Sequence, residues 1–301
     1  MEPAAAAGRL RSNELRGIVL ALAAMLLFGL MDAASKYLSV RYPTPQIIWL
    51  RYVFTIPMLL AVLAPRGVGR VLRSGRPWLQ VLRSGLLVLE MGLVIWCFGR
   101  LPLADVHAVL ALTPLAVTAL SVPLLGERVG VRRWAAVGAG FLGVLVILRP
   151  GLGVVQPASL VALVAMLLYG LYQVLTRLAG RVDGAETSLL WQLGVGAAMV
   201  SFVVPFAWRT PPLVHWPLFL LVAALGGVAH YAMIRALQLA PAAVIQPFTY
   251  TLLLWAVIIG YLGFGDLPDR WTVLGGAAIV GAGLYTAVRE HRLRQERVRP
   301  R

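Results

Sequence analysis

Ten long apolar stretches, joined by short connections, run along almost the whole chain of 301 residues. A helix needs about 20 apolar residues to cross the hydrocarbon core of a bilayer, and each stretch is close to that length or longer. The stretches cover residues 17–40, 45–64, 78–99, 102–125, 132–149, 157–179, 187–208, 216–239, 241–263 and 270–288. The sequence therefore predicts an all-α integral membrane protein with ten transmembrane helices.

The composition argues against a soluble domain. Charged residues make up 13% of the chain and hydrophobic residues 60%, whereas soluble proteins average about 25% charged residues. A soluble fold this apolar would lack the polar side chains that cover a core. The formal net charge of +15 could indicate a nucleic-acid partner, but the arginines fall mostly in the connections between apolar stretches. We therefore expect the lipid bilayer, and no nucleic acid, as a partner.

The arginines also predict an orientation, because cytoplasmic loops carry an excess of Lys and Arg. If the N-terminus is cytoplasmic, most of the 27 basic residues fall on the cytoplasmic side and the outer connections hold few each. The alternation continues through all ten stretches, which predicts that both termini are cytoplasmic. Residues 290–301 then form a basic cytoplasmic tail. The preference for Arg over Lys is typical of a GC-rich bacterial genome, so we expect the bacterial inner membrane.

The two halves of the chain resemble each other. LPLA at 101–104 and LQLA at 237–240 each open an apolar stretch that ends in a glycine followed by an acid. The matching positions are Gly126-Glu127 and Gly265-Asp266, then Trp134 and Trp271, then Gly138 and Gly275. Stretches four and five thus match stretches nine and ten, so the repeat is five spans long.

A repeat with an odd number of spans enters the membrane in opposite directions in its two copies. We therefore expect two inverted five-helix repeats, residues 1–150 and 151–289. Inverted repeats place a binding site near the bilayer midplane, where the repeats meet, and supply two related conformations for alternating access. This symmetry predicts a carrier more strongly than a channel.

Several segments resemble a known family. The first half contains PLLGERVGVRRW and GAGFLGVLVILRPG, the second contains GYLGFGDLPDRW and GGAAIVGAGLYTAVRE, and GLMDAASKYLSV with Arg51-Tyr52 lies near the N-terminus. Together they resemble the EamA-type transporters of the drug/metabolite transporter superfamily over nearly the whole chain. The resemblance implies ten helices in two inverted five-helix repeats around a central cavity. Members move amino acids, nucleoside-like and vitamin-like metabolites, and toxic compounds; Asp266 stands where a Glu is more usual.

Two opposite charges lie in the outer half of the first predicted helix. A charge at a helix centre costs roughly 2.5–3.5 kcal/mol on insertion scales, so such a residue usually has a partner. Asp32 and Lys36 are four residues apart, share one helix face and can pair. Two alternatives stay open: Lys36 extends to the outer surface, or Arg51 of the second span joins Asp32. The functional hypothesis places these residues at the mouth of the cavity or in a gate.

Glu90 is the most informative single residue. It lies about eleven residues into the third stretch, near the midplane, with no basic residue within one helical turn. Its carboxyl group is therefore either protonated in apolar surroundings or paired with another helix. Either state suits a transporter, as a proton carrier or as a counter-charge for a cationic or zwitterionic substrate. The structural alternative is a hydrogen bond that holds two helices together.

Weaker candidates combine aromatic, amide and imidazole groups. Rings and amides together suit an amphipathic metabolite, although Trp and Tyr also form belts at the membrane interfaces and a lone buried His is often only a hydrogen-bonding residue. The candidates are Trp96, His107, Tyr172, Gln173, Trp191, Gln192, His230, Gln246 and Tyr250. Pro114 and Pro247 fall inside predicted spans, where proline bends a helix.

An intramembrane enzyme is the main rival. GFGD at 263–266 matches the G-x-G-D pattern of intramembrane aspartyl proteases, which need a second facing aspartate, and Asp32 is the other deeply placed one. Asp266 nevertheless matches Glu127 in the repeat, which favours a helix-end role. The sequence contains no metal-ligand cluster and no nucleotide loop, so no cofactor is expected.

The resulting prediction is a secondary active transporter, not an enzyme. It would move a small amphipathic metabolite (amino-acid-like, S-adenosylmethionine-like, vitamin-like or drug) by alternating access through a cavity lined by spans 1, 3, 4, 6, 8 and 9. A proton gradient or an exchanged counter-substrate would supply the energy. The substrate, the direction of transport and the choice between monomer and homodimer stay open.

Overall fold

The computed structural model describes residues 2–63, 68–126, 129–148, 157–239 and 242–298; some side chains inside helices, among them those of 2–12, 246 and 290–298, are outside that description. The described part consists of helices and connections and contains no strand. The helices are α1 (Glu2–Ser39), α2 (Thr44–Leu63), α3 (Val68–Val71), α4 (Pro77–Phe98), α5 (Leu103–Leu110), α6 (Thr113–Leu125), α7 (Val131–Leu148), α8 (Pro157–Ala179), α9 (Ala185–Ser201), α10 (Trp216–Leu239), α11 (Ala242–Thr249), α12 (Thr251–Phe264) and α13 (Arg270–Val298). Short 3-10 turns cover Val204–Phe206 and Leu213–His215.

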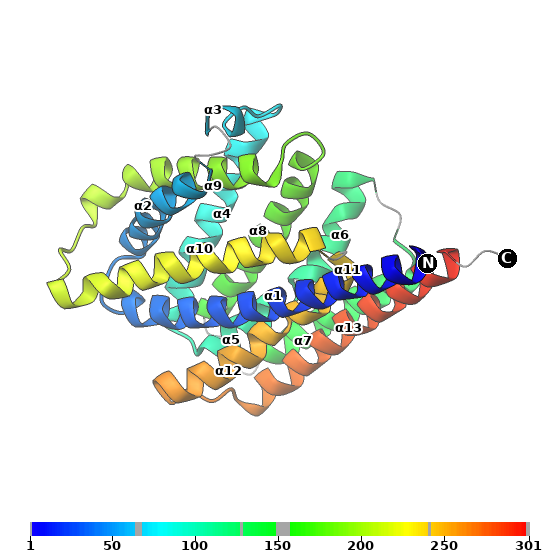
Figure 1. Cartoon of the computed structure of the whole chain (residues 1–301). Helices are drawn as coiled ribbons and strands as arrows, with labels where there is room; N and C mark the ends of the chain where they lie inside the picture. The colour runs from blue at the N-terminus through cyan, green and yellow to red at the C-terminus, as the bar shows by residue number, and fades with distance from the viewer. Residues whose placement is uncertain (1, 64–67, 127–128, 149–156, 240–241, 299–301) are drawn as a thin grey trace.

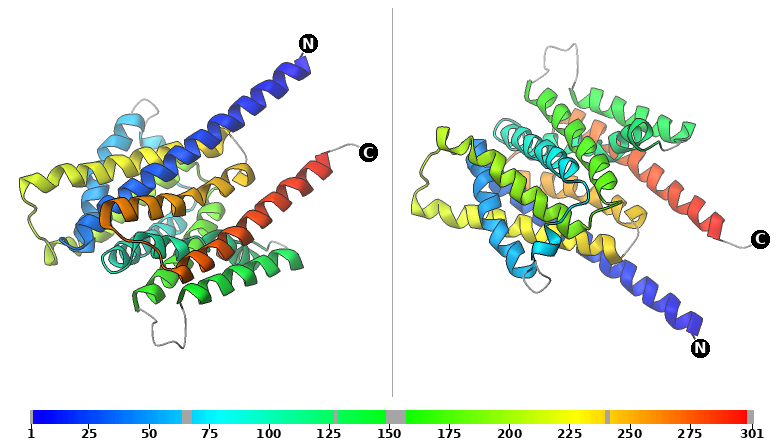
Figure 2. Two further views of the ribbon diagram at one scale, coloured as in Figure 1. Left: turned by 90° about the horizontal axis from the view of Figure 1, so that it is seen from below. Right: turned by 90° about the horizontal axis from the view of Figure 1, so that it is seen from above.

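The predicted membrane-spanning character is confirmed. Nine helical segments of the described part are long and apolar enough to cross a membrane. The helix α2, with 20 residues, is not among them, although it packs within the bundle against α9 and α10. The count of ten and the orientation with both ends inside therefore stay predictions. The first turn of α1 and the last turn of α13 lie at the same end of the molecule in Figures 1 and 2, as an even number of spans requires.

Two of the predicted spans are interrupted. The stretch at 102–125 forms α5 and α6, separated at Ala111 and Leu112, and the stretch at 241–263 contains α11 and α12, separated at Tyr250. Pro114 lies in the first turn of α6 and Pro247 lies inside α11. Proline has no N–H to donate to the preceding turn and its ring crowds that turn. This accounts for the break just before Pro114, whereas the break at Tyr250 follows Pro247.

Both interrupted spans end in the same way. Gly126 after α6 has φ of 68° and Gly265 after α12 has φ of 71°, both in the left-handed region. Only glycine adopts this conformation at little cost, and these two are the only glycines with positive φ in the part of the chain that the structure describes. The matched glycines of the two halves therefore have matched backbone roles.

The helix packing shows the same correspondence between halves. The pairs α1–α10 and α4–α8 are among the most extensive contacts, and each joins the first helix of one half to the third of the other. The pair α7–α13 joins the last helices of the two halves. There, a Cβ added to Gly143 would lie 2.8 Å from the carbonyl oxygen of Gly275. The glycine clusters therefore permit close backbone approach within one chain.

Candidate functional site

A central cavity of about 1020 Å³ lies between the two halves. Residues of α1, α2, α4, α5, α6, α8, α9, α10, α11 and α12 line it, with Tyr250 at the α11–α12 interruption. The expected lining by spans 1, 3, 4, 6, 8 and 9 therefore misses α2 and α9. Their contributions include Arg51 and Tyr52 from α2 and Gln192 from α9.

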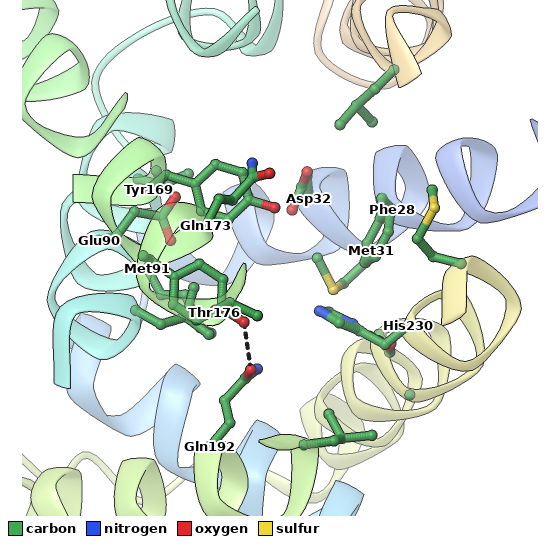
Figure 3. A pocket seen from close by; sticks show the side chains of 18 of the residues that line it. Phe28, Met31, Asp32, Glu90, Met91, Tyr169, Gln173, Thr176, Gln192 and His230 are labelled. Carbon is green, nitrogen blue, oxygen red and sulfur yellow. Dashed lines mark hydrogen bonds between the residues drawn. The ribbon is translucent and has the colours of Figure 1, made fainter. Parts of the chain in front are cut away.

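Most of the residues expected at the site come together in this cavity. Figure 3 shows part of its lining, with Asp32 of α1 and Gln173 of α8 pointing toward one another beside Glu90 of α4. The expected residues in the lining are Asp32, Arg51, Glu90, His107, Tyr172, Gln173, Gln192, His230 and Tyr250. The side chain of Gln246 lies outside the described residues.

Three expected residues lie elsewhere. The Lys36 ammonium contacts Asp266 Oδ2 at 2.8 Å and donates to the carbonyl oxygen of Leu101, also at 2.8 Å. The Arg100 guanidinium lies over the Trp96 ring, with its Cζ 3.8 Å from the ring centroid. Trp191 Nε1 donates to the carbonyl oxygen of Leu72 at 2.9 Å, which holds α9 against the connection after α3.

The expected pair of Asp32 and Lys36 is absent. The Asp32 carboxylate faces His107 of α5, with Oδ2 3.3 Å from Nε2, and the His107 side chain is 5% exposed. Helical spacing allows the i, i+4 pair, but tertiary packing brings a different partner nearer to each charge. The suggested pair of Asp32 with Arg51 is not found in the described part either.

Asp32 and Asp266 do not form the facing pair that a protease needs. Asp266 contacts Lys36 and lies outside the cavity lining, whereas Asp32 lies inside it beside His107. Each aspartate therefore has a basic neighbour of its own.

Glu90 is buried in the wall of the cavity. It is 7% exposed, and Figure 3 shows its carboxyl group close to Tyr169 and Gln173. Among the described residues it has neither a hydrogen-bond partner nor an ion pair within 4 Å. The hydrogen bond that would make Glu90 a structural link between helices is therefore not found there.

Arg51 lines the cavity from α2. Its guanidinium lies against α10 at Gly226, where an added Cβ would be 3.2 Å from Nε and 3.3 Å from Nη2. A Cβ at position 226 would therefore be closer to the guanidinium than ordinary van der Waals contact allows. Because Gly226 has no Cβ, the Arg51 side chain can occupy this space. Like Glu90, Arg51 has no hydrogen bond or ion pair to another described residue.

Aromatic and sulfur-containing side chains complete the wall. The rings of Tyr169 and Tyr172 are stacked, with centroids 5.8 Å apart and planes 14° apart, and the Tyr172 hydroxyl donates to Gln192 Oε1 at 2.7 Å. His230 Nδ1 lies 2.7 Å from the carbonyl oxygen of Gly226. The methionines in the lining are Met25, Met31, Met58, Met91 and Met233. Such a surface accommodates a flat ring system.

Arg83 is a buried residue that the sequence patterns do not single out. It lies in α4, near the start of the third apolar stretch, and is 1% exposed. Its Nε donates to Gln80 Oε1 at 2.5 Å, its Nη1 to Thr176 Oγ1 at 3.1 Å, and its Nη2 to the carbonyl oxygen of Ser188. The guanidinium thus joins α4 to α8 and α9. Its position five residues after Trp78, inside an apolar stretch, was the available signal.

Asp183 connects the same helices outside the membrane-spanning segments. It accepts hydrogen bonds from the Ser74 hydroxyl, from Gly75 N–H at 2.7 Å and from Gln80 Nε2 at 2.7 Å. Burial alone raises the pKa of its carboxyl group, but these hydrogen bonds and the nearby Arg83 charge outweigh it, so the pKa is lowered. The connection after α8 is thereby held to the start of α4.

A lowered carboxyl pKa predicts a pH-dependent contribution to stability. The contribution of Asp183 is complete above the pKa of the unfolded chain and is lost as the pH falls through the lower folded pKa. We expect Asp183→Asn to melt a few degrees below the native protein at pH 7, with a difference that shrinks on acidification. Thermal unfolding in nanodiscs across this pH range measures it; a difference independent of pH would contradict the assignment.

The cavity is closed at one end. The last lining residues at this end are Ser35 of α1 and Phe98 of α4, and both are buried. The contact between Lys36 and Asp266 lies beyond Ser35. At that end α5 packs on α12, whereas their counterparts α6 and α11 do not pack on each other to a comparable extent in the described part. Elsewhere the lining reaches exposed residues, namely Met58, Gly180, Gly184, Val228 and Tyr231. The two ends of a molecule built from two similar halves therefore differ.

Comparison with known proteins gives a consistent result. The EamA-like transporter family matches the chain twice, over residues 15–149 and 156–288. The chain is 29% identical over 297 residues to a riboflavin transporter of Rhizobium johnstonii, covering 95% of each protein. It is 27% identical over 274 residues to an S-adenosylmethionine uptake transporter of Rickettsia prowazekii, covering 90% of this chain and 92% of that one. A crystal structure with 20% sequence identity has the same fold, with a TM-score of 0.65 over 92% of this chain and 98% of the other.

Proposed function

Because the chain belongs to the EamA-like transporter family, we propose that it is a secondary carrier that moves a small amphipathic metabolite by alternating access. Family membership and the named relatives make it a multi-pass transporter of small metabolites in the bacterial inner membrane, and a transporter rather than an enzyme. The carrier mechanism and the kind of metabolite are the proposed steps.

One observation supports alternating access above the others. The cavity is closed where α5 meets α12 and Lys36 meets Asp266, whereas the corresponding helices α6 and α11 do not pack on each other to a comparable extent in the described part of the chain. In an inverted-repeat protein, exchanging the conformations of the two halves closes the open end and opens the closed one. Each half would act as one five-helix repeat, residues 1–150 and 151–289, with residues 290–301 as a cytoplasmic tail.

The substrate proposal rests on the size and lining of the cavity. A volume of about 1020 Å³ accommodates a molecule as large as a nucleoside derivative or a vitamin. The relatives are named for riboflavin and for S-adenosylmethionine, and both compounds carry a flat ring system. The stacked pair Tyr169 and Tyr172 would pack against such a ring, with Gln173 and Gln192 orienting its polar edge.

Uptake into proteoliposomes tests this proposal. The purified protein is reconstituted and offered labelled amino acids, S-adenosylmethionine, riboflavin, nucleosides and organic cations, with and without a pH gradient or a preloaded unlabelled compound. We expect saturable accumulation of one class, driven by the gradient or by exchange. Absence of accumulation by folded protein, or an unsaturable leak, would contradict a carrier.

A further inference from the structure

The cavity lining holds an acid and a base that do not pair with each other. Glu90 and Arg51 both line it, and no ion pair within 4 Å joins them. The other charged groups of the lining already have neighbours: Asp32 faces His107, Arg83 donates to Gln80, Thr176 and Ser188, and Asp183 accepts from Ser74, Gly75 and Gln80. Glu90 and Arg51 are therefore the acid and the base of the lining that have neither a hydrogen bond nor an ion pair to another described residue.

Keeping two separated charges inside a membrane protein is costly. An ionisable group without a protein partner in such a site keeps its charge only while water fills the cavity, because loss of hydration favours the neutral form. A ligand that carries both an anionic and a cationic group would restore both interactions when it binds. A neutral ligand of the same size would remove the water and leave both charges unpaired.

We propose that Arg51 and Glu90 form a zwitterion receptor, in which each of the two side chains binds the ligand group of opposite charge. This substrate class rests on the proposed carrier function. The Arg51 guanidinium would bind a carboxylate, to which its N–H groups can donate two parallel hydrogen bonds. The Glu90 carboxyl group would accept a hydrogen bond from an ammonium group or lie against a sulfonium group. The stacked rings of Tyr169 and Tyr172, next to Glu90, would face the cation and any flat ring attached to it. The ligand class is thus an α-amino acid derivative with a flat ring.

Gly226 positions the Arg51 guanidinium. It leaves the space in which the Arg51 guanidinium lies, since an added Cβ would be 3.2 Å from Nε and 3.0 Å from Met31 Sδ. Gly226→Ala should therefore displace Arg51 while keeping its charge. We expect this variant to weaken binding of a carboxylate-bearing probe more than binding of one that lacks the carboxylate.

Binding to the full-length protein in nanodiscs tests the proposal. The first probe is S-adenosylmethionine, which has a carboxylate, an ammonium group and a sulfonium group; tryptophan and histidine are further zwitterions, and riboflavin is the neutral comparison. Losing one partner of a desolvated charge pair costs about 2 kcal/mol or more, which is about 30-fold in Kd. We expect Glu90→Gln and Arg51→Gln each to weaken zwitterion binding by at least that factor.

Matched control variants test whether the effect is specific to Glu90 and Arg51 or follows from any change of charge in the protein. Glu14→Gln and Arg100→Gln change a carboxylate and a guanidinium outside the cavity lining and should leave binding unchanged. Decarboxylated S-adenosylmethionine keeps the cationic groups, so its weaker binding should depend on Glu90 and no longer on Arg51. Folding of each variant is checked by its elution and thermal unfolding.

The outcomes distinguish this inference from the carrier proposal. If riboflavin is bound and transported and neither substitution matters, the carrier stands and the zwitterion receptor is wrong. If zwitterions bind with the expected losses but none is transported, the receptor stands and the carrier proposal fails. Folded protein that binds none of the zwitterions overturns the inference.

Discussion

Replacing Arg83 by methionine is expected to lower the free energy of unfolding by on the order of 3 kcal/mol. The guanidinium is 1% exposed and donates to Gln80, Thr176 and the carbonyl oxygen of Ser188. Methionine fills similar space but has no donor, so the buried Gln80 amide oxygen and Ser188 carbonyl oxygen would lose a hydrogen-bond partner. Because the guanidinium joins α4 to α8 and α9, we expect the loss to appear in global unfolding.

Thermal or denaturant unfolding in nanodiscs measures this effect. Arg76→Met is the matched control, because Arg76 is an exposed arginine immediately before α4. Arg83→Lys keeps the charge but lacks the forked geometry, so it should fall between the two. Equal stability of Arg83→Met and Arg76→Met would contradict a structural role for Arg83.

Reversing either charge of the Lys36–Asp266 pair is expected to lower the transport rate about tenfold. The pair ties the end of α1 to the connection between α12 and α13, with 2.8 Å between Lys36 Nζ and Asp266 Oδ2. The two side chains are 13% and 31% exposed, so solvent screening limits the pair to about 1.4 kcal/mol, a tenfold change in an equilibrium constant. Like charges would bias the carrier against the state with this end closed.

A charge swap makes this prediction specific. Lys36→Asp combined with Asp266→Lys restores opposite charges, and we expect it to recover most of the rate lost by either single variant. Initial uptake into proteoliposomes is the measurement, and Arg100→Asp, near the same end but outside the pair, is the control. Failure of the swap to recover any activity, with all variants folded, would show that the pair does not govern closure.

The sequence predicted the helical membrane fold, the repeat and most of the cavity, for an identifiable reason. Apolar stretches and the matched Gly126 and Gly265 are local signals, and a charge such as Glu90 in the middle of an apolar stretch must face protein or water. The choice of partner is not local. Asp32 contacts His107 and Lys36 contacts Asp266 because helices distant in sequence bring these groups closer than the i, i+4 neighbour.

Two other features could not be predicted from sequence patterns. Arg83 lies near the start of an apolar stretch, where a loop residue and a buried residue look alike until α8 and α9 supply its acceptors. The contribution of α2 and α9 to the lining depends on how the helices cross. The prolines indicated bends, but the interruptions at Ala111 and Tyr250 depend on tertiary packing as well.

The central claim, that one cavity is exposed to each side of the membrane in turn, is tested most directly by labelling a cysteine within it. Gln173 lines the cavity, and Cys97 is the only cysteine in the chain, so Gln173→Cys in a Cys97→Ala background has a single reactive thiol. A membrane-impermeant maleimide is applied to right-side-out and to inside-out vesicles. We expect labelling from both sides, with labelling from the side of the Lys36–Asp266 pair increased by Lys36→Asp. Labelling from one side only, unchanged by Lys36→Asp and by transported compound, would contradict alternating access.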